Sequence, residues 1–495
     1  MSNPPTIIQG GMGVAVSHWR LAQTVSRLGQ LGVVSGTALD QVLVRRLQDG
    51  DPGGHMRRGL DRFPFPHMAE RIWRSYYVSG GKARGAAYKT LPMPVSTSNR
   101  ELQELWITAN FVEVVLAREG HDYPVGINYL EKVQIPHLCS LYGAMLAGVS
   151  YVIMGAGIPT KIPGVLDAFV HHEPATYPLH VAGAPEGERT TLRFDPGVFA
   201  ECALPHLRRP KFLAIVASNT LAATMIKKSN GKVDGLVIEG PTAGGHNAPP
   251  RGKLQLNRRG EAIYGERDRV DLAALRELGV PFWLAGGYGT AESLHRALAA
   301  GAAGVQVGTA FAFCAESALR EDYKRALLRK AAAGDADVFT DPVSSPTGFP
   351  FKAAQLEGSL SEYKAYAARP RICDLGFMRE AHWTDGGVIE YRCSAEPEAA
   401  YLAKGGKLET TVGKKCLCNA LLANVGYPQM RCGNRLEQGL ITAGDDLTTL
   451  ARFLPPAGLG YSAADVIATI LDEAAPEMPH ASGVTVPELC ASPCD

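Results

Sequence analysis

Hydrophobic residues in this chain gather in short, continuous runs that are closed by Gly, Ser or Asn and separated by helix-like segments. The runs occupy residues 6–9, 31–35, 125–128, 151–154, 212–216, 235–239, 282–285 and 304–307. Hydrophobicity that is continuous rather than alternating indicates strands covered on both faces, as in parallel sheets with helical crossovers. The pattern therefore predicts eight parallel strands.

A loose internal repeat supports this architecture. Segments 138–157, 219–240 and 292–310 each combine a helix rich in small residues, a turn that contains Gly and an apolar strand. Eight such strands within roughly 310 residues predict an α/β fold, a (β/α)8 TIM barrel with insertions. A doubly wound open sheet has the same local pattern and is the alternative.

The spacing of the strands also predicts the domain boundaries. We expect residues 1–371 to form the barrel, with a mostly helical insert at about 51–115 and an insert with short strands at about 158–209. The alternation of strand and helix is lost from about residue 372. Residues 372–495 are therefore expected to form a smaller, mainly helical C-terminal appendage.

Composition limits the classes of partner. The chain has 495 residues, 46% hydrophobic and 20% charged, with a formal net charge of +1. A near-neutral balance provides no field that gathers nucleic acid or an acidic membrane, so neither is expected as a partner. The sequence has neither a signal-like N-terminus nor about eighteen consecutive apolar residues, which favours a cytoplasmic protein. Its ten cysteines are scattered and favour reduced, buried thiols over a disulfide scaffold.

Glycines dominate the positions that follow the predicted strands, which is where a barrel of this kind places its reactive groups. Gly286 and Gly287 follow the seventh run, and Gly308 and Thr309 follow the eighth. Many barrels hold a phosphate at this place against the N-terminus of a short helix. Either pair alone would be explained by a tight turn, but both in this order favour phosphate binding.

A second set of small residues follows the first run. Gly11 and Gly13 flank Met12 and remove side chains where a flat ring must come close, and Asn128 after the third run could bond a ring carbonyl or N–H group. A turn from strand to helix would also explain these glycines. A phosphate on one side of the barrel and a planar heterocycle on the other together suggest flavin mononucleotide (FMN).

One histidine, His246, stands directly after Gly244 and Gly245 at the end of the sixth run. A lone histidine is more often a satisfied core or surface residue than a catalyst. Its place over the predicted flavin changes that balance, because an imidazole with a pKa of about 6.5 can exchange a proton at neutral pH. We therefore predict His246 as the catalytic acid or base.

Four motifs, "IIQGGMG", "EGPTAGGH", "LAGGYGT" and "GVQVGTAFAFCAES", occur in this order between about residues 6 and 352. In these motifs the chain resembles the nitronate monooxygenase (2-nitropropane dioxygenase-like) family, together with its relatives, the flavin-dependent trans-acting enoyl reductases. The resemblance implies a TIM barrel that binds FMN without a covalent link. It implies FMN contacts from Gly11, Met12, Gly13, Asn128, Gly244, Gly245, Gly286, Gly287, Gly308 and Thr309, and it places His246 on the family's active-site histidine.

The chain departs from the family pattern around the histidine. Many relatives have an acidic residue where this chain has Thr242, and a glycine soon after the histidine where it has Asn247 and Ala248. The segment 345–352 and the overall length look more like the enoyl reductases of polyunsaturated fatty acid and polyketide synthesis.

The resemblance implies two activities on a small-molecule substrate. The first is oxidation of nitronates or nitroalkanes with O2 through a flavin semiquinone. The alternative is an enoyl reductase that uses NAD(P)H as reductant and acts on enoyl thioesters bound to an acyl carrier protein. A docking surface for such a carrier would include Arg57, Arg58, Lys82, Arg84 and Lys89, although scattered charges of this kind are more often simply solvated. A homodimer is compatible with the sequence.

A third interpretation is a non-catalytic flavin- or metal-binding module. Cys416, Cys418 and Cys432 would be the metal ligands, with Cys393 as the fourth. Their spacing matches no strong zinc pattern. Buried thiols are the preferred interpretation, and no metal site is predicted.

Overall fold

An eight-stranded parallel barrel forms the centre of the computed structural model, which describes residues 4–96, 99–201, 203–456 and 458–473. Its strands are β1 (Ile7–Gln9), β2 (Gly32–Ser35), β3 (Val125–Leu130), β4 (Tyr151–Gly155), β8 (Lys211–Val216), β9 (Gly235–Glu239), β11 (Phe282–Ala285) and β12 (Gly304–Val307). Their spatial order is β1-β12-β11-β9-β8-β4-β3-β2, and every neighbouring pair is parallel. The eight predicted strands and the TIM barrel are confirmed.

Backbone contacts between β1 and the residue before β2 close the barrel. Ile8 and Leu31 form a parallel bridge. The Leu31 N–H donates to the Ile7 carbonyl at 3.0 Å, and the Gln9 N–H donates to the Leu31 carbonyl at 2.9 Å. A closed ring excludes the open doubly wound sheet and places the C-terminal ends of all eight strands around one opening.

The barrel interior is filled by an apolar layer that is separate from the core between strands and helices. Its buried members are Ile8, Leu31, Val33, Tyr151, Ile153, Leu213, Val237, Trp283 and Ala285. The indole N–H of Trp283 donates to the Pro5 carbonyl at 2.7 Å at the N-terminal end of the barrel. Inward residues fill this layer and outward residues contact the helices, which explains why the strands are hydrophobic without alternation.

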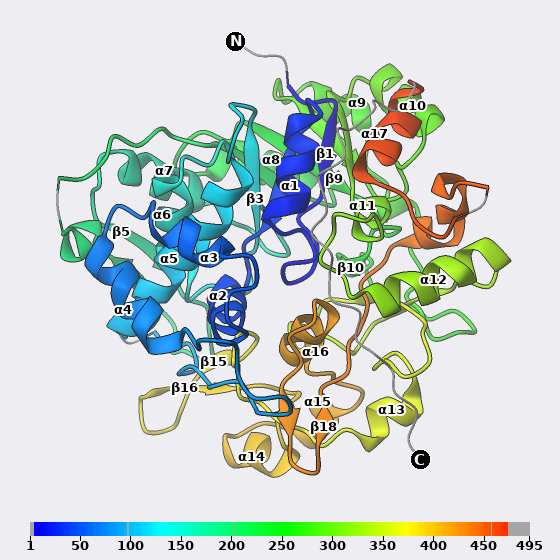
Figure 1. Ribbon diagram of the computed structural model, residues 1–495. Coiled ribbons are helices and arrows are strands. Elements are labelled where there is room, and N and C mark those ends of the chain that lie inside the picture. Colours follow the sequence, from blue (N-terminus) through cyan, green and yellow to red (C-terminus); the bar gives the residue numbers. More distant parts are fainter. Residues whose placement is uncertain (1–3, 97–98, 202, 457, 474–495) are drawn as a thin grey trace.

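Helices surround the strands (Figure 1). They are α1 (Trp19–Arg27), α5 (Arg100–Ala117), α6 (His137–Leu146), α7 (Ile162–Val170), α8 (Asn219–Lys228), α9 (Leu272–Arg276), α10 (Ala291–Ala299), α11 (Thr309–Ala312) and α12 (Glu321–Ala333), with the 3-10 turn η2 (Glu266–Asp268) before α9. In the described part of the chain, no helix combines the length and the apolar composition needed to span a bilayer.

Between β2 and β3 the chain forms α2 (Leu39–Gln48), which precedes the first predicted insert, and then α3 (His55–Leu60), α4 (Pro66–Tyr76) and α5, which make up the helices of that insert. A buried ion pair joins α2 to α5, because Arg46 Nη1 lies 2.6 Å from Glu113 Oε2. The other oxygen of Glu113 accepts the Trp19 N–H at 2.9 Å. One carboxylate of α5 therefore holds both α2 and the start of α1.

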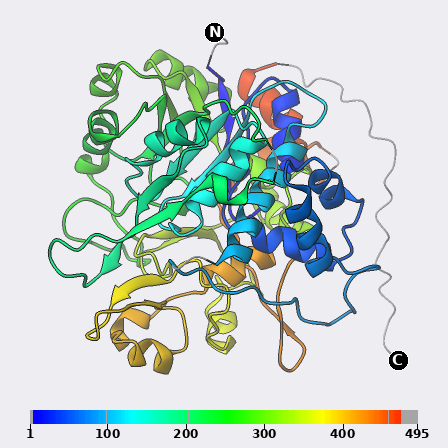
Figure 2. The same cartoon turned by 90° about the vertical axis from the view of Figure 1, so that its left-hand side faces the viewer.

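The second insert shares a sheet with the C-terminal segment. The insert contains β5 (Ala175–Pro178), β6 (Val181–Ala182), β7 (Thr191–Phe194) and η1 (Pro196–Phe199). Strand β6 pairs in parallel with β15 (Glu380–Trp383), which pairs with β16 (Ile389–Arg392). Figure 1 shows β15 and β16 below the barrel, and Figure 2 shows the yellow part of the chain there as well.

The remaining elements follow the barrel in sequence but return to it in space. They are β13 (Val338–Asp341), β14 (Phe351–Ala354), α13 (Tyr363–Ala368), α14 (Glu398–Ala403), α15 (Leu408–Thr411), α16 (Leu417–Asn424), β17 (Met430–Arg431), β18 (Arg435–Leu436), η3 (Asp445–Phe453) and α17 (Ala463–Leu471). Strand β14 pairs with β10 (Gly245–His246), and α17 contacts α1, α10 and α11. Residues after 372 thus cover part of the barrel surface and its opening.

The close packing of α5 on α6 depends on Gly143, and this gives a stability prediction. A Cβ atom at this position would lie 2.0 Å from the Ile107 carbonyl oxygen. Because neither backbone can yield easily, we expect Gly143→Ala to lower the free energy of unfolding by about 1–3 kcal/mol in urea denaturation. Gly265→Ala is the control, since a Cβ there meets nothing within 4 Å. Equal stability of the two variants would contradict the prediction.

Candidate functional site

One cavity of about 220 Å³ opens at the C-terminal ends of the strands. Every residue predicted for cofactor binding or catalysis lines it. They are Gly11, Met12, Gly13, Asn128, Gly244, Gly245, His246, Gly286, Gly287, Gly308 and Thr309. The structure brings together residues that are up to about 300 positions apart in sequence, because barrel closure gathers the strand ends. Their individual roles stay predictions.

The glycines of this wall allow a ligand to come close to the backbone. Gly286 has a φ of +90°, and a Cβ there would lie 2.8 Å from Thr242 Oγ1. At Gly11 a Cβ would lie 2.4 Å from the Cβ of Asn128. Side chains at these positions would therefore fill the cavity wall or displace their neighbours, so glycine leaves the backbone accessible to a ligand.

Asn128 contributes an unpaired acceptor to the wall. Its Nδ2 donates to the Gly11 carbonyl at 3.2 Å, whereas its Oδ1 is buried without a hydrogen-bond partner. Thr442 Oγ1 is buried and unpaired in the same way, and both residues line the cavity. Buried polar atoms without partners are costly. These two atoms therefore fit a ligand that has its own polar groups.

His246 lies on β10 and is held by the strand beside it. Its Nε2 lies 2.7 Å from the Ser345 hydroxyl, and its ring meets the rings of Phe351 and Phe349 edge-on at 4.9 and 6.4 Å. Burial lowers the pKa of His246 to about 4. The imidazole is therefore neutral at neutral pH. Among the described residues only its Nε2 has a hydrogen-bond partner, so Nδ1 is available to a ligand.

A second chamber of about 560 Å³ adjoins the first. Its lining is largely apolar and includes Ile158, Leu221 and Phe349, with Arg251 and Tyr264 as polar members. Four residues line both spaces, namely Ala156, Ile215, Glu239 and His246. The imidazole of His246 and the carboxyl of Glu239 therefore stand where the two chambers meet.

Glu239 is a site residue that the sequence prediction missed. It is the last residue of β9, and burial raises its pKa to about 8, so the carboxyl keeps its proton at neutral pH. Its side chain has no hydrogen-bond partner among the described residues. The signal was a single acidic residue at the end of an otherwise apolar run, but the run was assigned only as a strand.

The C-terminal segment supplies a further part of the wall that was not predicted. Thr442, Ala443 and Asp446 line the main cavity. The Gly444 N–H donates to the Thr309 hydroxyl at 2.9 Å, and Lys352 on β14 pairs with Asp445 at 2.6 Å. The predicted phosphate-binding residue Thr309 thus contacts a segment to which the sequence analysis assigned no function. Phe377, Met378, Cys418 and Leu421 complete this side.

The model of the nitronate monooxygenase family matches residues 198–348. The matched segment contains β8, β9, β11 and β12, His246 and the predicted phosphate site. Over this segment the chain is similar to the nitronate monooxygenase family, and the match covers less than a third of its length. The family match leaves out Gly11, Met12, Gly13 and Asn128, which the barrel nevertheless places in the same cavity.

Curated proteins of this family resemble part of the chain. The chain is 29% identical over 196 residues to a nitronate monooxygenase of Pseudomonas aeruginosa. The aligned region covers 40% of this chain and 52% of that protein. The chain is 32% identical over 175 residues to one of Paraburkholderia phytofirmans, spanning 34% of this chain and 40% of that protein. The matches thus cover about half of these relatives or less.

Other comparisons extend beyond the monooxygenases. A carboxyl-CoA dehydrogenase of Mycobacterium tuberculosis is 28% identical over 205 residues, which is 40% of this chain and 52% of that protein. Among solved structures, FabK from Thermotoga maritima aligns with 95% of this chain and 92% of its own at 16% identity, with a TM-score of 0.48. A nitroalkane oxidase from Streptomyces ansochromogenes aligns with 95% and 96% at 16% identity, with a TM-score of 0.47.

Proposed function

We propose that this chain is an FMN-dependent oxidoreductase of the nitronate monooxygenase type, which oxidises nitronates or nitroalkanes with O2. The observation that carries the proposal is the position of His246. It lines the same cavity at the barrel opening as all ten residues predicted to contact the flavin. The match of residues 198–348 to the nitronate monooxygenase family model supports the reaction class.

The cavity wall fits a flavin nucleotide. The unpaired Oδ1 of Asn128 is an acceptor for an N–H group of the flavin ring, and Gly11 leaves room for the ring beside it. Gly308 and Thr309 lie at the start of α11, and Gly286 and Gly287 follow β11 in the wall of the same cavity. Backbone N–H groups at such positions suit a phosphate. Asp446 lines this cavity too, and burial raises the pKa of its carboxyl.

The bound flavin would supply electron transfer between the substrate and O2. The protein itself must handle the proton on the substrate's α-carbon. His246 is neutral and can donate its Nε2–H to the Ser345 hydroxyl, which leaves the Nδ1 lone pair to accept that proton. Ser345 is in turn fixed by Thr347, whose hydroxyl lies 2.8 Å away.

Glu239 would act as a hydrogen-bond donor opposite this base. Its carboxyl is protonated at neutral pH and faces both chambers, so it can donate to an oxygen of a substrate that spans them. A neutral carboxylic acid is a strong donor in a site of low polarity. The donor would favour the form of the substrate in which charge has moved onto that oxygen.

The size of the second chamber favours a second candidate function. About 560 Å³ exceeds the needs of a small nitroalkane and suits an extended acyl group. An enoyl reductase that uses NAD(P)H and FMN is therefore the alternative, and the similarity to a carboxyl-CoA dehydrogenase agrees with a thioester substrate.

The predicted carrier-docking charges are largely occupied within the chain. Arg57 pairs with Asp61 at 2.8 Å and Arg58 with Glu119 at 3.0 Å. Lys82 and Lys89 lie over the rings of Tyr88 and Tyr76. These contacts favour a role within the insert over the docking of an acyl carrier protein.

The first test is spectroscopic. We expect the purified protein, after loading with FMN, to show flavin absorbance that is bleached anaerobically by a nitronate and not by NADPH or NADH. Bleaching by a nicotinamide would replace the monooxygenase proposal with the enoyl reductase. Failure to take up FMN would contradict both.

The second test concerns the base. We expect His246→Asn to retain FMN, because the ring contacts lie elsewhere, and to lower kcat by at least about 100-fold. His295→Asn, an exposed histidine on α10, is the control and should leave kcat unchanged. A His246→Asn variant that regains the normal rate when FMN is added would exclude catalysis by His246.

The third test is the pH profile of kcat. His246 gains a proton only as pH falls through about 4, and Glu239 loses its proton as pH rises through about 8. Activity should therefore be highest between these values. Glu239→Gln should remove the decline near pH 8 and keep the decline near pH 4, while Glu277→Gln, an exposed control, should keep both. An unchanged basic limb in Glu239→Gln would refute the role of Glu239.

A further inference from the structure

Four cysteines meet around one small cavity outside the site described above. Cys373, Cys393, Cys416 and Cys418 line a space of about 10 Å³, and all four are free thiols. They come from three segments, namely the chain before β15, the end of β16 and the start of α16. A cavity of this volume has room for a single ion or water molecule and not for a larger ligand or a multinuclear metal cluster.

The sulfur atoms are surrounded by hydrogen-bond donors. The backbone N–H of Ala395 donates to Cys393, that of Asn419 donates to Cys416, and those of Phe377 and Met378 donate to Cys418. The Asn419 side chain also donates to Cys416 Sγ at 3.5 Å. N–H donors stabilise thiolates more than neutral thiols, because charge strengthens the hydrogen bond. Burial acts in the opposite direction and raises the pKa of Cys416 and Cys418, so these thiols keep their protons until a cation binds.

Cations surround the same group. Arg379 is within electrostatic range of Cys373 and Cys393, Lys414 of Cys393, and Arg369 of Cys416. The nearby carboxylates already have partners, since Glu396 pairs with Lys404 at 2.8 Å and Asp374 with Arg431 at 2.6 Å. Arg369 is itself paired with Glu437, whereas Arg379 and Lys414 form no ion pair in the described part of the chain. These two cations suit a centre with a net negative charge.

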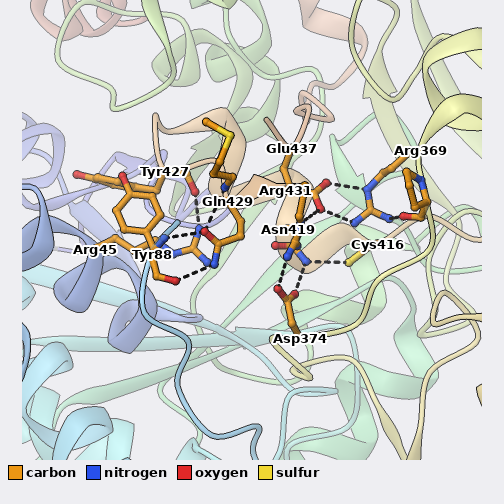
Figure 3. A network of polar contacts seen from close by, with 12 residues as sticks. Arg45, Tyr88, Arg369, Asp374, Cys416, Asn419, Tyr427, Gln429, Arg431 and Glu437 are labelled. Carbon is orange, nitrogen blue, oxygen red and sulfur yellow. Dashed lines mark hydrogen bonds and ion pairs between the residues drawn. The ribbon is translucent and has the colours of Figure 1, made fainter. Parts of the chain in front are cut away.

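A polar network holds one side of the cluster in place (Figure 3). Asn419 bridges Cys416 and Asp374, with its bond to Asp374 at 2.7 Å. Arg431 joins Asp374 to Glu437, and Glu437 accepts two bonds from Arg369 at 2.7 and 2.9 Å. Partners of this kind orient the ligands of metal centres.

We propose that Cys373, Cys393, Cys416 and Cys418 bind a single zinc or iron ion through their four sulfurs. Soft thiolates arranged around one point select such ions. In the described part of the chain no three His, Cys, Asp or Glu side chains have metal-ligand spacing as they stand. Binding therefore requires the four thiols to turn toward the cavity and release four protons to solvent, which leaves a divalent centre with a net charge of −2.

The site would stabilise the wall of the main cavity. Met378 and Cys418 line both the small cavity and the main one. A bound ion would link the segment around Met378 to β16 and α16. This structural role is independent of the reaction that the main cavity performs.

Metal analysis of the full-length protein, purified under reducing conditions without chelators, tests the proposal. We expect about one equivalent of zinc or iron per chain, either as purified or after anaerobic reconstitution with that metal. X-ray absorption should show four sulfur neighbours, at about 2.3 Å if the metal is zinc. Elemental analysis distinguishes the two metals, and either supports the site.

Variants locate the metal. Cys393→Ser and Cys416→Ser should each retain less than about a tenth of an equivalent, whereas Cys432→Ser, an exposed cysteine outside the cluster, should retain all of it. If the first two fail to fold, thiol titration of the native protein replaces them. A mercurial reagent should then release the metal as the four thiols react.

Three results would overturn the proposal. One is a chain that neither contains nor takes up zinc or iron. Another is a disulfide between Cys373 and Cys393, which are hydrogen-bonded to each other. The last is metal that stays bound in Cys416→Ser. Each can be read without flavin or substrate, so failure here is distinguishable from failure of the proposed oxidoreductase activity.

Discussion

Closure of the barrel is the constraint on which the rest of the molecule depends. A short ladder of backbone hydrogen bonds between Ile7, Gln9 and Leu31 joins the first strand to the second. Without that contact the sheet would be open and its strand ends would lie along an edge. With it, glycines after β1, β11 and β12 face Asn128 and His246 across a single cavity.

Both the fold and most of the site could be predicted because their physical signals are local. Continuous apolar runs indicate strands buried on two faces. The residue that follows a parallel barrel strand lies at the reactive end of the barrel, and this position does not depend on the conformation of the loop that follows. This is why Gly286, Thr309 and His246 could be found without coordinates. Glu239 was missed since a single sequence does not show which way the last side chain of a strand points.

Other parts of the site depend on contacts between distant segments, which have no local signal. Nothing in the residues around Thr442 or Asp446 indicates that they cover a barrel opening that begins at Gly10. The cysteines illustrate the same limit, because the metal-binding interpretation weighed for the sequence named Cys432 with Cys393, Cys416 and Cys418, whereas the structure brings Cys373 to the cluster and leaves Cys432 exposed. Proximity in space was set by β15, β16 and α16 packing together.

The dependence of the site on residues 442–446 has a consequence for biosynthesis. The ribosome has made every barrel strand by Val307, yet Thr309 gains its Gly444 partner and Lys352 its Asp445 partner only about 130 and 90 residues later. A nascent chain therefore presents an open barrel for several seconds at usual elongation rates of about 5–20 residues per second. Enclosure of a ligand is thus one of the last events in the maturation of this molecule.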